Sequence, residues 1–524
     1  MSPPGPSASR HRYRVRVLTC GVLALHGVIT MTSTPPAAAE PARSSQHANR
    51  PRTVVTTDME SDDLASLIRY LLYTNELDTQ GIVYTSSRYH WAGDGKGTRF
   101  FLPGREYQTP QTSWRWTGTR TIQDQVLRAY AEVYPNLRRH DPRYPAPGAL
   151  LATVKVGNIA FEGEMATDTE GSDLIRDLLL DDDPRPVYLQ AWGGTGTIAR
   201  ALKSIEDRFA GTGRWPRIKA AVSAKAVILA SGFQDETYAE YIAPSWPDVR
   251  VQNLEGGYAT WGFNCEWGQG NVRGLPADRV YFSGAWTREN IQIGPLGSLY
   301  RSWLDGQAMP GDPLDIFGDA ERAPSGWCKP LDPYDFLSEG DNVAFNPLLD
   351  TGIQAPDDPA LGGWGGRSIR RSTTPNLWTL APAEQDGTGA EVQNYTTLRW
   401  AGAAQNDFAA RMRWTLTPDY RAADHPPTVR IDGGGTVRAR PGSVVTLTGR
   451  ATDPDHDRVT LRWWQYREEG TYPGRVTIAD HGHGRASVTV PDDAAGQSVS
   501  IILQGTDDGE FPLTRYARVL IQVI

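Results

Sequence analysis

Cysteine is scarce in this 524-residue sequence, which contains three, and no cysteine–histidine pattern has the spacing of a zinc site. Cys20 lies in an N-terminal segment that we expect to be cleaved off, so Cys265 and Cys328 remain. In an oxidising compartment these two can form a disulfide. Two buried free thiols are the alternative, and the sequence alone does not choose between them.

Two further features are missing: an excess of positive charge and a long apolar run in the body of the chain. Lys and Arg number 53 against 61 Asp and Glu, and the formal net charge is −8. A mildly acidic protein is poorly suited to nucleic acid or to anionic membranes. Beyond the N-terminus, no segment is apolar enough to cross a bilayer. We therefore expect neither nucleic acid nor a membrane as a partner.

The N-terminus has the three parts of a secretory signal. Four arginines between residues 10 and 16 precede a short apolar segment, residues 17–31, and an Ala-Ala-Ala sequence ending at Ala39 offers a cleavage site. We therefore expect residues 1–39 to be a signal peptide and residues 40–51 to be a flexible N-terminus. The mature protein would then be secreted and soluble.

From residue 52 to residue 354, strand-like and helix-like patterns alternate. Short apolar runs predict buried strands, and they lie at 53–56, 81–85, 186–192 and 226–230. Residues 122–134 have the apolar spacing of a helix, and another helix is expected to open near Ser172 as its N-cap. The alternation predicts an α/β domain, with a mostly parallel sheet and helices on both faces.

The rest of the chain divides at Pro426-Pro427. Residues 355–425 are rich in Gly, Pro and polar residues, and we expect them to link the two domains and wrap around the first. Residues 426–524 contain short alternating strands separated by turns, which is typical of a small immunoglobulin-like β-sandwich. The predicted strands are 428–431, 444–447, 459–466, 486–490, 498–504 and 517–524.

Two features of this C-terminal region have more than one interpretation. The sequence Asp-Pro-Asp-His-Asp at 453–457 could bind Ca²⁺, but it lacks the glycine and the terminal glutamate of an EF-hand loop. We favour a hairpin turn. Trp463 and Trp464 are neighbours on a predicted strand and should face opposite sides. One is expected in the core, and the other either offers a flat face to a sugar or meets the first domain.

The most informative segment is the acidic turn, residues 57–63, with the sequence Thr-Asp-Met-Glu-Ser-Asp-Asp. It follows a strand pattern and precedes a helix pattern. Its four carboxylates repel one another, and at the end of a parallel strand a bound cation or a catalytic centre explains them best. The alternative is an acidic loop in which an Asp or a Ser caps the helix.

Polar or glycine-rich residues also follow three other predicted strands. They are Thr85-Ser86-Ser87, the turn 193–197 and Gln234-Asp235. The carboxyl ends of parallel strands lie at one edge of a sheet, where ligands of such proteins bind. These segments are therefore candidates for the same site as the acidic turn.

The strand, acidic turn and helix resemble the fingerprint of the nucleoside hydrolase superfamily, D-x-D-P-G-x-D-D. The match is residues 56–63: three of the four acids are retained as Asp58, Asp62 and Asp63, the first is a threonine, and Glu60 stands at the glycine. More closely, the chain is similar to a bacterial secreted family of unknown function that is often labelled cellulose-binding. That family joins a nucleoside-hydrolase-like domain to a C-terminal β-domain. The similar segments are TTDMESDDLASLIRYLLY, QAWGGTGTIARAL, SEGDNVAF and ATDPDHDRVTLRWWQYREEGTYPG.

The resemblance implies a role for each matching residue. Asp58 would bind Ca²⁺ and act as the base that orients the attacking water, and Asp62 would bind sugar hydroxyls. Asp63 would be a second Ca²⁺ ligand. The backbone carbonyl of Gly196 and the carboxylate of Asp341 would complete the metal shell, because Ca²⁺ takes oxygen ligands of all these kinds.

Two parts of the family pattern differ in this chain. Gly340 stands where the family has a histidine, and the family's N-x-x-x-E-x-N ribose clamp has no clear match. Gln234 and Asp235 lie at roughly the place of the clamp, and we expect both of them, with Glu339, to contact the substrate. For Asp341 the alternative to a metal ligand is a helix cap.

These features together predict an exported Ca²⁺-dependent hydrolase of an N- or O-glycosidic bond, in which a metal-bound water attacks an anomeric carbon. The substrate would be a small glycoside or a glycan. A carbohydrate-binding protein without catalysis is the alternative, favoured by the missing histidine and clamp and by 17 Trp and 21 Tyr, whose rings can stack on sugars. A third reading is a structural module of an exported assembly.

Overall fold

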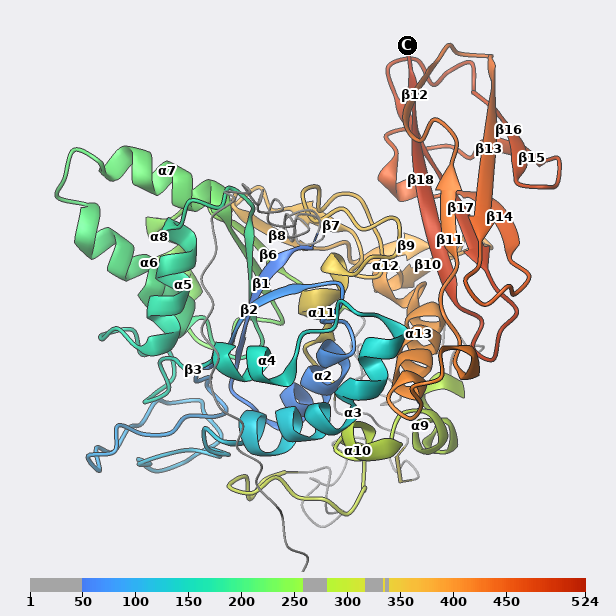
Figure 1. Cartoon of the computed structure of the whole chain (residues 1–524). Helices are drawn as coiled ribbons and strands as arrows, with labels where there is room; N and C mark the ends of the chain where they lie inside the picture. The colour runs from blue at the N-terminus through green and yellow to red at the C-terminus, as the bar shows by residue number, and fades with distance from the viewer. Residues whose placement is uncertain (1–49, 258–279, 316–332, 335–338) are drawn as a thin grey trace, which may run out of the picture. The chain divides into compact units, whose positions relative to one another are not determined.

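An eight-stranded sheet forms the centre of the first part of the chain (Figure 1). The structure is a computed structural model that describes residues 50–257, 280–315, 333–334 and 339–524. The strand order is β3-β2-β1-β4-β5-β6-β8-β7, and neighbouring strands are parallel except β7 and β8. The strands are β1 (Arg52–Thr57), β2 (Asp78–Tyr84), β3 (Val154–Val156), β4 (Val187–Ala191), β5 (Ala226–Ala230), β6 (Arg250–Asn253), β7 (Ser368–Arg370) and β8 (Leu377–Leu380).

Helices cover both faces of this sheet, which confirms the predicted α/β domain. Val54 and Val55 are neighbours on β1 and point to opposite faces. Val55 shares a core with α2 (Ser61–Leu71), α3 (Leu127–His140), α11 (Asn342–Phe345) and α13 (Ala401–Trp414). Val54 shares the other core with α5 (Glu170–Leu180), α6 (Gly196–Phe209) and α7 (Trp215–Lys225). Shorter helices are α4 (Pro147–Thr153), α8 (Ala243–Ser245), α9 (Gly284–Asn290), α10 (Gly294–Gly297) and α12 (Tyr395–Leu398).

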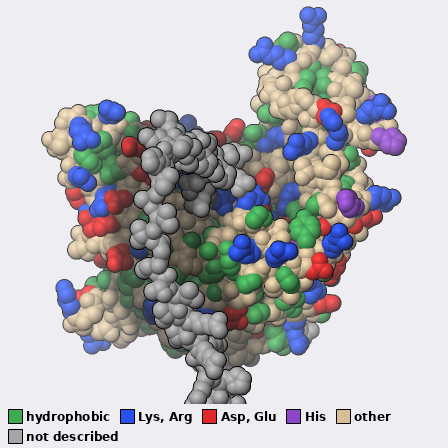
Figure 2. Space-filling model, in the orientation of Figure 1, with side chains coloured by type: hydrophobic (Ala, Val, Ile, Leu, Met, Phe, Trp, Pro, Cys, Tyr) green, Lys and Arg blue, Asp and Glu red, His purple; other side chains and the backbone are tan. Residues whose placement is uncertain are grey.

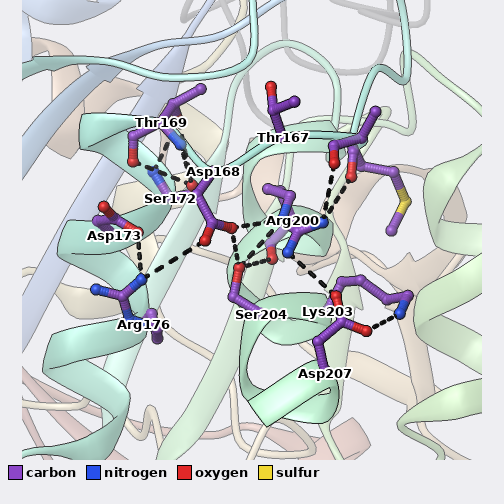
Figure 3. A network of polar contacts seen from close by, with 12 residues as sticks. Thr167, Asp168, Thr169, Ser172, Asp173, Arg176, Arg200, Lys203, Ser204 and Asp207 are labelled. Carbon is purple, nitrogen blue, oxygen red and sulfur yellow. Dashed lines mark hydrogen bonds and ion pairs between the residues drawn. The ribbon is translucent and has the colours of Figure 1, made fainter.

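Polar side chains tie α5 to α6 (Figure 3). The N-cap of α5 is Thr169, whose hydroxyl accepts a hydrogen bond from the Ser172 N–H while the Ser172 hydroxyl accepts one from the Thr169 N–H. The prediction of Ser172 as N-cap is therefore wrong by three residues, because in this reciprocal capping box the serine is the partner of the cap. Asp168 accepts a hydrogen bond from Arg200 Nε at 2.7 Å and one from the Ser204 hydroxyl, both on α6.

The segment 355–425 contains more regular structure than its composition predicts. Strands β7 and β8 extend the main sheet, and β9 (Ala383–Gln385) and β10 (Glu391–Gln393) form a hairpin. Helix α13 is buried around almost its whole circumference. A helix buried on all sides has no apolar stripe to mark it, and this explains why the sequence pattern misses it.

Residues 428–523 form two four-stranded sheets, which confirms the predicted β-sandwich. Their orders are β11-β13-β16-β15 and β12-β18-β17-β14. The strands are β11 (Thr428–Ile431), β12 (Gly435–Ala439), β13 (Val444–Thr452), β14 (Thr460–Gln465), β15 (Thr477–Asp480), β16 (Arg485–Thr489), β17 (Ser498–Thr506) and β18 (Thr514–Val523). The sequence misses β12 and β15, because both are short and largely exposed and so lack a clear apolar alternation.

The two neighbouring tryptophans of β14 point to opposite sides, as predicted. Trp463 lies in the core of the sandwich. Trp464 packs against Trp400, the residue before α13, with the ring centroids 6.0 Å apart. Beside it, the Tyr466 hydroxyl donates a hydrogen bond to Glu384 at 3.0 Å. Aromatic burial therefore joins the sandwich to the segment that carries α13.

Some sequence predictions lie outside the described residues: the signal peptide at 1–39, most of the flexible N-terminus at 40–51, and the pairing of Cys265 with Cys328. Within the described part of the chain, no helix combines the length and the apolar character needed to cross a membrane. On the face shown in Figure 2, acidic and basic side chains are interspersed rather than separated into fields of one sign.

Candidate functional site

The acidic turn lies where the order of strands in the main sheet reverses. From β1 the chain goes through α2 to β2 on one side of the sheet, and later returns to β4 on the other side of β1. Such a reversal leaves a crevice beyond the carboxyl ends of the two central strands, and ligands bind there. The acidic turn follows β1, and the glycine turn 193–197 follows β4, so both predicted segments meet at this crevice.

Asp58 is the first residue after β1, and its carboxylate is fully buried. Neither of its oxygens has a hydrogen-bond partner. Gly193 of the glycine turn lies against it, and a Cβ atom at that position would come within 2.9 Å of the Asp58 Cγ. The glycine thus allows the end of β4 to approach the carboxylate. A buried carboxylate whose oxygens accept no hydrogen bond is suited to a bound cation, because burial removes the water that would otherwise solvate its charge.

Asp63 and Asp341 each add one free, buried oxygen to this site. In the first turn of α2, Asp63 Oδ1 accepts a hydrogen bond from the Thr57 hydroxyl, whereas Asp63 Oδ2 has no partner. Asp341 precedes α11, yet its side chain makes no capping hydrogen bond, and its Oδ2 has no partner. The alternative interpretation of Asp341 as a helix cap is therefore wrong for its side chain.

The charges of these carboxylates oppose one another. Burial raises the pKa of Asp62, Asp63 and Asp341 well above the usual range, and repulsion from neighbouring carboxylates raises each of them further. For Asp341 the neighbours responsible are Asp58 and Glu60. A divalent cation would offset this repulsion. The donors are all hard oxygens with free lone pairs, so the residues present fit Ca²⁺.

The structure adds two residues to the site that the sequence analysis did not assign, Glu60 and His90. Ligand atoms of Asp58, Glu60 and His90 lie within 4.8 Å of one another, and so do those of Glu60, Asp62 and Asp63. Glu60 therefore connects the two groups. Its position at the glycine of the family fingerprint is the signal that could have identified it.

His90 connects the carboxylates of the site to a second ion pair. Its Nδ1 lies 3.1 Å from Glu60 Oε2 and 3.5 Å from Asp58 Oδ2, and its Nε2 lies 3.5 Å from Asp312 Oδ2. Arg115 donates to both oxygens of Asp312 at 3.0 Å. Burial lowers the pKa of His90, but Glu60, Asp312 and Asp58 raise it to about 9. The imidazole is thus a cation near pH 7. Its place six residues beyond the end of β2 is the only signal in the sequence.

Gly340, at the position of the family's histidine, lies against Asp62. A Cβ atom there would come within 2.2 Å of Asp62 Oδ2, so a side chain at this position requires Asp62 to move. The Gly340 carbonyl also accepts a hydrogen bond from the Ser231 hydroxyl at 3.1 Å, which holds this backbone beside β5. The present position of Asp62 therefore depends on the glycine.

This packing gives a testable prediction. In Gly340→Ala we expect the Asp62 side chain to be displaced. The displacement should also disturb the hydrogen bond that the Asp63 N–H donates to Asp62 Oδ1 at 3.1 Å. Ca²⁺ affinity measured by calorimetry should fall about tenfold or more, as for other changes beside metal ligands. Gly211→Ala is the matched control, because a Cβ atom there meets nothing within 4 Å. Equal Ca²⁺ affinity in Gly340→Ala and the wild type would contradict this geometry.

Asp235, predicted to contact the substrate, is hydrogen-bonded within the protein. Asp235 is buried and accepts four hydrogen bonds, from Thr195 Oγ1, the Gly196 N–H, the Thr237 N–H and Thr237 Oγ1, at 2.6–3.0 Å. It thereby holds the first turn of α6. Gly196 lies in that turn beside Asp235, whereas Gly193 is the residue that contacts Asp58. The geometry gives Asp235 a structural task and leaves the role of the Gly196 carbonyl a prediction.

Glu339 is also hydrogen-bonded within the protein. Its two oxygens accept hydrogen bonds from Arg69 Nε at 2.5 Å and Arg69 Nη2 at 2.8 Å, and one of them accepts from the Tyr300 hydroxyl at 2.8 Å. This fully buried ion pair fixes the segment that leads into Asp341. Gln234 donates from Nε2 to the Trp192 carbonyl at 2.9 Å, and its Oε1 has no partner. Of the predicted substrate contacts outside the acidic turn, Gln234 is the one with a free acceptor.

The sheet, its crevice and the acidic turn define a nucleoside-hydrolase-like α/β protein with a C-terminal β-sandwich. Two family models match the chain: "Cellulose-binding Sde182, nucleoside hydrolase-like domain" over residues 52–368, and "Cellulose-binding protein Sde0182, C-terminal domain" over residues 444–523. The chain therefore belongs to the family of Sde182-type proteins, and the predicted resemblance is confirmed.

A solved structure agrees with this assignment. A nucleoside hydrolase-related hypothetical protein from Saccharophagus degradans, described as associated with carbohydrate metabolism, is 25% identical and superposes with a TM-score of 0.66. The match covers 91% of this chain and 100% of that one. The titin M3 domain also matches, at 13% identity over 18% of this chain and 95% of that chain, with a TM-score of 0.14. No curated protein matches the chain.

Proposed function

We propose that the protein is an exported, Ca²⁺-dependent hydrolase of a glycosidic bond. The observation that carries the proposal is the set of buried carboxylate oxygens without partners, on Asp58, Asp63 and Asp341, at the strand-order reversal of a nucleoside-hydrolase-like sheet. These three residues would hold the ion. When bound, Ca²⁺ would offset the negative charge and acidify a water molecule in the crevice.

Two residues of the acidic turn would accept the proton of the water and bind the sugar. Asp58 accepts the proton of the attacking water, because it is a carboxylate at the strand-order reversal whose two oxygens accept no hydrogen bond. Asp62, which is only partly buried, binds a hydroxyl of the sugar. Their negative charges also favour the positive charge that develops on a sugar ring when its glycosidic bond breaks.

His90 supplies the imidazole that position 340 lacks. Its protonated ring lies between the carboxylates of Glu60, Asp58 and Asp312. Arg115 holds Asp312 in place by donating a hydrogen bond to it. A protonated imidazole beside a crevice can donate a proton to a leaving group. We therefore assign to His90 the task of holding a proton at this site, in place of the family's histidine.

A carbohydrate is the substrate class that the relatives support. The matched family models are named for cellulose binding, and the solved relative is described as associated with carbohydrate metabolism. Export would place the protein among extracellular glycosides and glycans. These observations favour a sugar-containing substrate, and they leave the aglycone to be found by experiment.

Carbohydrate binding without catalysis is the second candidate, and one observation favours it. A cavity of about 650 Å³ lies between the sandwich and the segment before α13, lined by aromatic and charged side chains that include Trp400, Trp464, Arg399 and Glu468. Trp464 Nε1 is buried there without a hydrogen-bond partner. Aromatic rings with polar groups around them are suited to sugar binding.

Calorimetry tests the proposed metal. Chelator-treated wild type should bind Ca²⁺, and Asp63→Ala should bind one equivalent fewer, because it removes a ligand whose oxygen has no other partner. Asp177→Ala, an exposed carboxylate on α5, is the control and should bind as the wild type does. Absence of Ca²⁺ binding by the wild type would refute the metal site.

A substrate panel separates the two candidate functions. Turnover of any nucleoside or glycoside by the Ca²⁺-loaded wild type supports the hydrolase. The binding protein is supported if nothing on the panel is turned over and the wild type is retained on cellulose while Trp464→Phe is not. Trp464→Phe keeps an aromatic ring and removes the indole N–H.

A further inference from the structure

A second group of carboxylates lies at one end of the β-sandwich, far along the chain from the acidic turn. Three segments contribute to it: Asp424 before β11, the turn 453–457 between β13 and β14, and Asp507 after β17. Ligand atoms of Asp424, Asp455 and Asp457 lie within 4.8 Å of one another. Residues that are distant in the sequence therefore converge on one place.

The segment 453–457 is a tight turn, but the predicted hairpin is wrong, because β13 and β14 on its two sides belong to different sheets. Asp453 Oδ1 accepts hydrogen bonds from the N–H groups of Asp455 at 2.8 Å and Asp457 at 3.0 Å, and His456 takes a positive φ of 69°. This geometry places the carboxylates of Asp455 and Asp457 on the side of Asp424. A turn and a metal site are thus compatible here, because the turn is what gathers the carboxylates.

Free, buried oxygens distinguish this group from an ordinary acidic surface. Asp424 is 7% exposed; its Oδ2 accepts from the Phe511 N–H at 2.9 Å, and its Oδ1 has no partner. Asp507 is 4% exposed; its Oδ1 accepts from the Leu513 N–H at 2.8 Å, and its Oδ2 has no partner. Asp453 Oδ2 is a third buried oxygen without a partner. In each case the protein holds one oxygen and leaves the other open.

One neighbour of the group is a histidine. His425 Nδ1 lies 3.1 Å from both oxygens of Asp455. Its other ring nitrogen, Nε2, lies 3.0 Å from His140 Nδ1. This histidine therefore contacts Asp455, and it leaves the buried oxygens of Asp424, Asp453 and Asp507 without a hydrogen bond.

We propose that Asp424, Asp453, Asp455, Asp457 and Asp507 bind a structural Ca²⁺ at this end of the sandwich. Carboxylates from three segments provide the all-oxygen, flexible shell that Ca²⁺ prefers, and Mg²⁺ is a poorer fit because it demands a stricter octahedron. The missing glycine and glutamate of an EF-hand do not matter, since Asp424 and Asp507 supply the ligands that a single loop would provide.

The bound ion would fasten the sandwich to the helical segment before it. The Asp424 carbonyl accepts a hydrogen bond from Trp414 Nε1 at 2.8 Å, and Trp414 is the last residue of α13. His425, next to Asp424, contacts His140 at the end of α3, with 3.0 Å between their ring nitrogens. A cation that draws Asp424 to the turn 453–457 therefore stabilises this junction. The inference does not depend on the proposed hydrolase, because it uses none of the residues in the crevice.

The test is Ca²⁺ titration of chelator-treated protein by calorimetry, with the full mature chain. Asp424→Asn/Asp507→Asn keeps the shape of both side chains and an acceptor for each backbone N–H, and removes two ligand charges. We expect this variant to bind one Ca²⁺ equivalent fewer than the wild type, whatever the crevice binds. Asp432→Asn is the matched control, because Asp432 is an exposed carboxylate of the same domain that pairs with Arg450. It should bind as the wild type does.

Thermal unfolding gives an independent readout. Without Ca²⁺ the double variant should unfold at the same temperature as the wild type or higher, because repulsion between the carboxylates is relieved. With Ca²⁺ the wild type should gain more stability than the variant.

Asp457→Asn should weaken Ca²⁺ binding about tenfold or more, since ligand charge sets Ca²⁺ affinity. Equal Ca²⁺ stoichiometry in wild type and double variant, or unchanged binding in Asp457→Asn, would overturn the proposal.

Discussion

On a glycoside that the wild-type protein hydrolyses, we expect Asp58→Asn to lower kcat by about 10²–10⁴-fold, the usual contribution of a positioned general base. Asparagine has the shape of aspartate but cannot take a proton from water. Neither Asp58 oxygen has a hydrogen-bond partner, so the change removes only the 3.5 Å ion pair with His90, and the fold should be retained. The measurement is kcat and KM at saturating Ca²⁺.

A comparison with Asp62→Ala separates the two acids. Asp62 is assigned a contact with the sugar, so its removal should raise KM as well as lower kcat. Asp58→Asn should change kcat with little effect on KM, and it should weaken Ca²⁺ only modestly because Asp63 and Asp341 remain. Asp177→Asn, on the exposed side of α5, is the control for a lost surface charge. A kcat within a few-fold of the wild type in Asp58→Asn would refute its role as the base.

The second large effect is on stability. We expect Arg69→Met to lower the free energy of unfolding by about 3–5 kcal/mol, as when one partner of a buried ion pair is removed. The Arg69 and Glu339 side chains are 2% and 0% exposed, and they share two hydrogen bonds. Without Arg69, the fully buried Glu339 carboxylate would lose both hydrogen bonds from the guanidinium. Urea unfolding followed by circular dichroism gives the value.

Two further variants test the cause of that loss. Arg69→Met/Glu339→Gln should recover part of the stability, because the uncompensated charge is gone while the volume is kept. Arg120→Met is the matched control: Arg120 pairs with Asp124 at 2.6 Å on an exposed surface, and we expect no measurable loss. If Arg69→Met and Arg120→Met unfold at the same urea concentration, the buried pair does not stabilise the fold.

The same pair also affects the site. Glu339 is two residues before Asp341, and the Asp341 N–H donates to the Ser66 hydroxyl on α2 at 2.9 Å. Arg69 lies on the same helix as Ser66. The pair thus fixes the distance between α2 and the late segment that brings Asp341 to the crevice. Glu339, which was predicted to contact the substrate, therefore helps to position Asp341. The sequence could not distinguish these two tasks, because a carboxylate two residues before Asp341 suits both.

Local patterns in the sequence were sufficient for much of the architecture. A strand or a helix can be recognised from a few residues, because its backbone geometry repeats every two residues in a strand and every 3.6 in a helix. In α2 the apolar residues Leu64, Leu67, Ile68 and Leu71 follow the helical period, so the helix is clear and the acidic turn before it could be placed at a strand end. The buried helix α13 and the exposed strand β15 carry no such contrast, and the patterns missed both.

Local patterns therefore set the order of the elements and place Asp58, Asp62 and Asp63 at the end of a strand. The distant groups that meet these residues depend on the fold as a whole. His90 reaches Asp58 from another loop, Asp62 lies against the position of the missing histidine, and Asp424 joins Asp455 and Asp457 in a carboxylate cluster. The reason is physical: hydrogen bonds of a helix or turn are local, whereas the charge balance of a buried group depends on whatever the fold brings within a few ångströms of it.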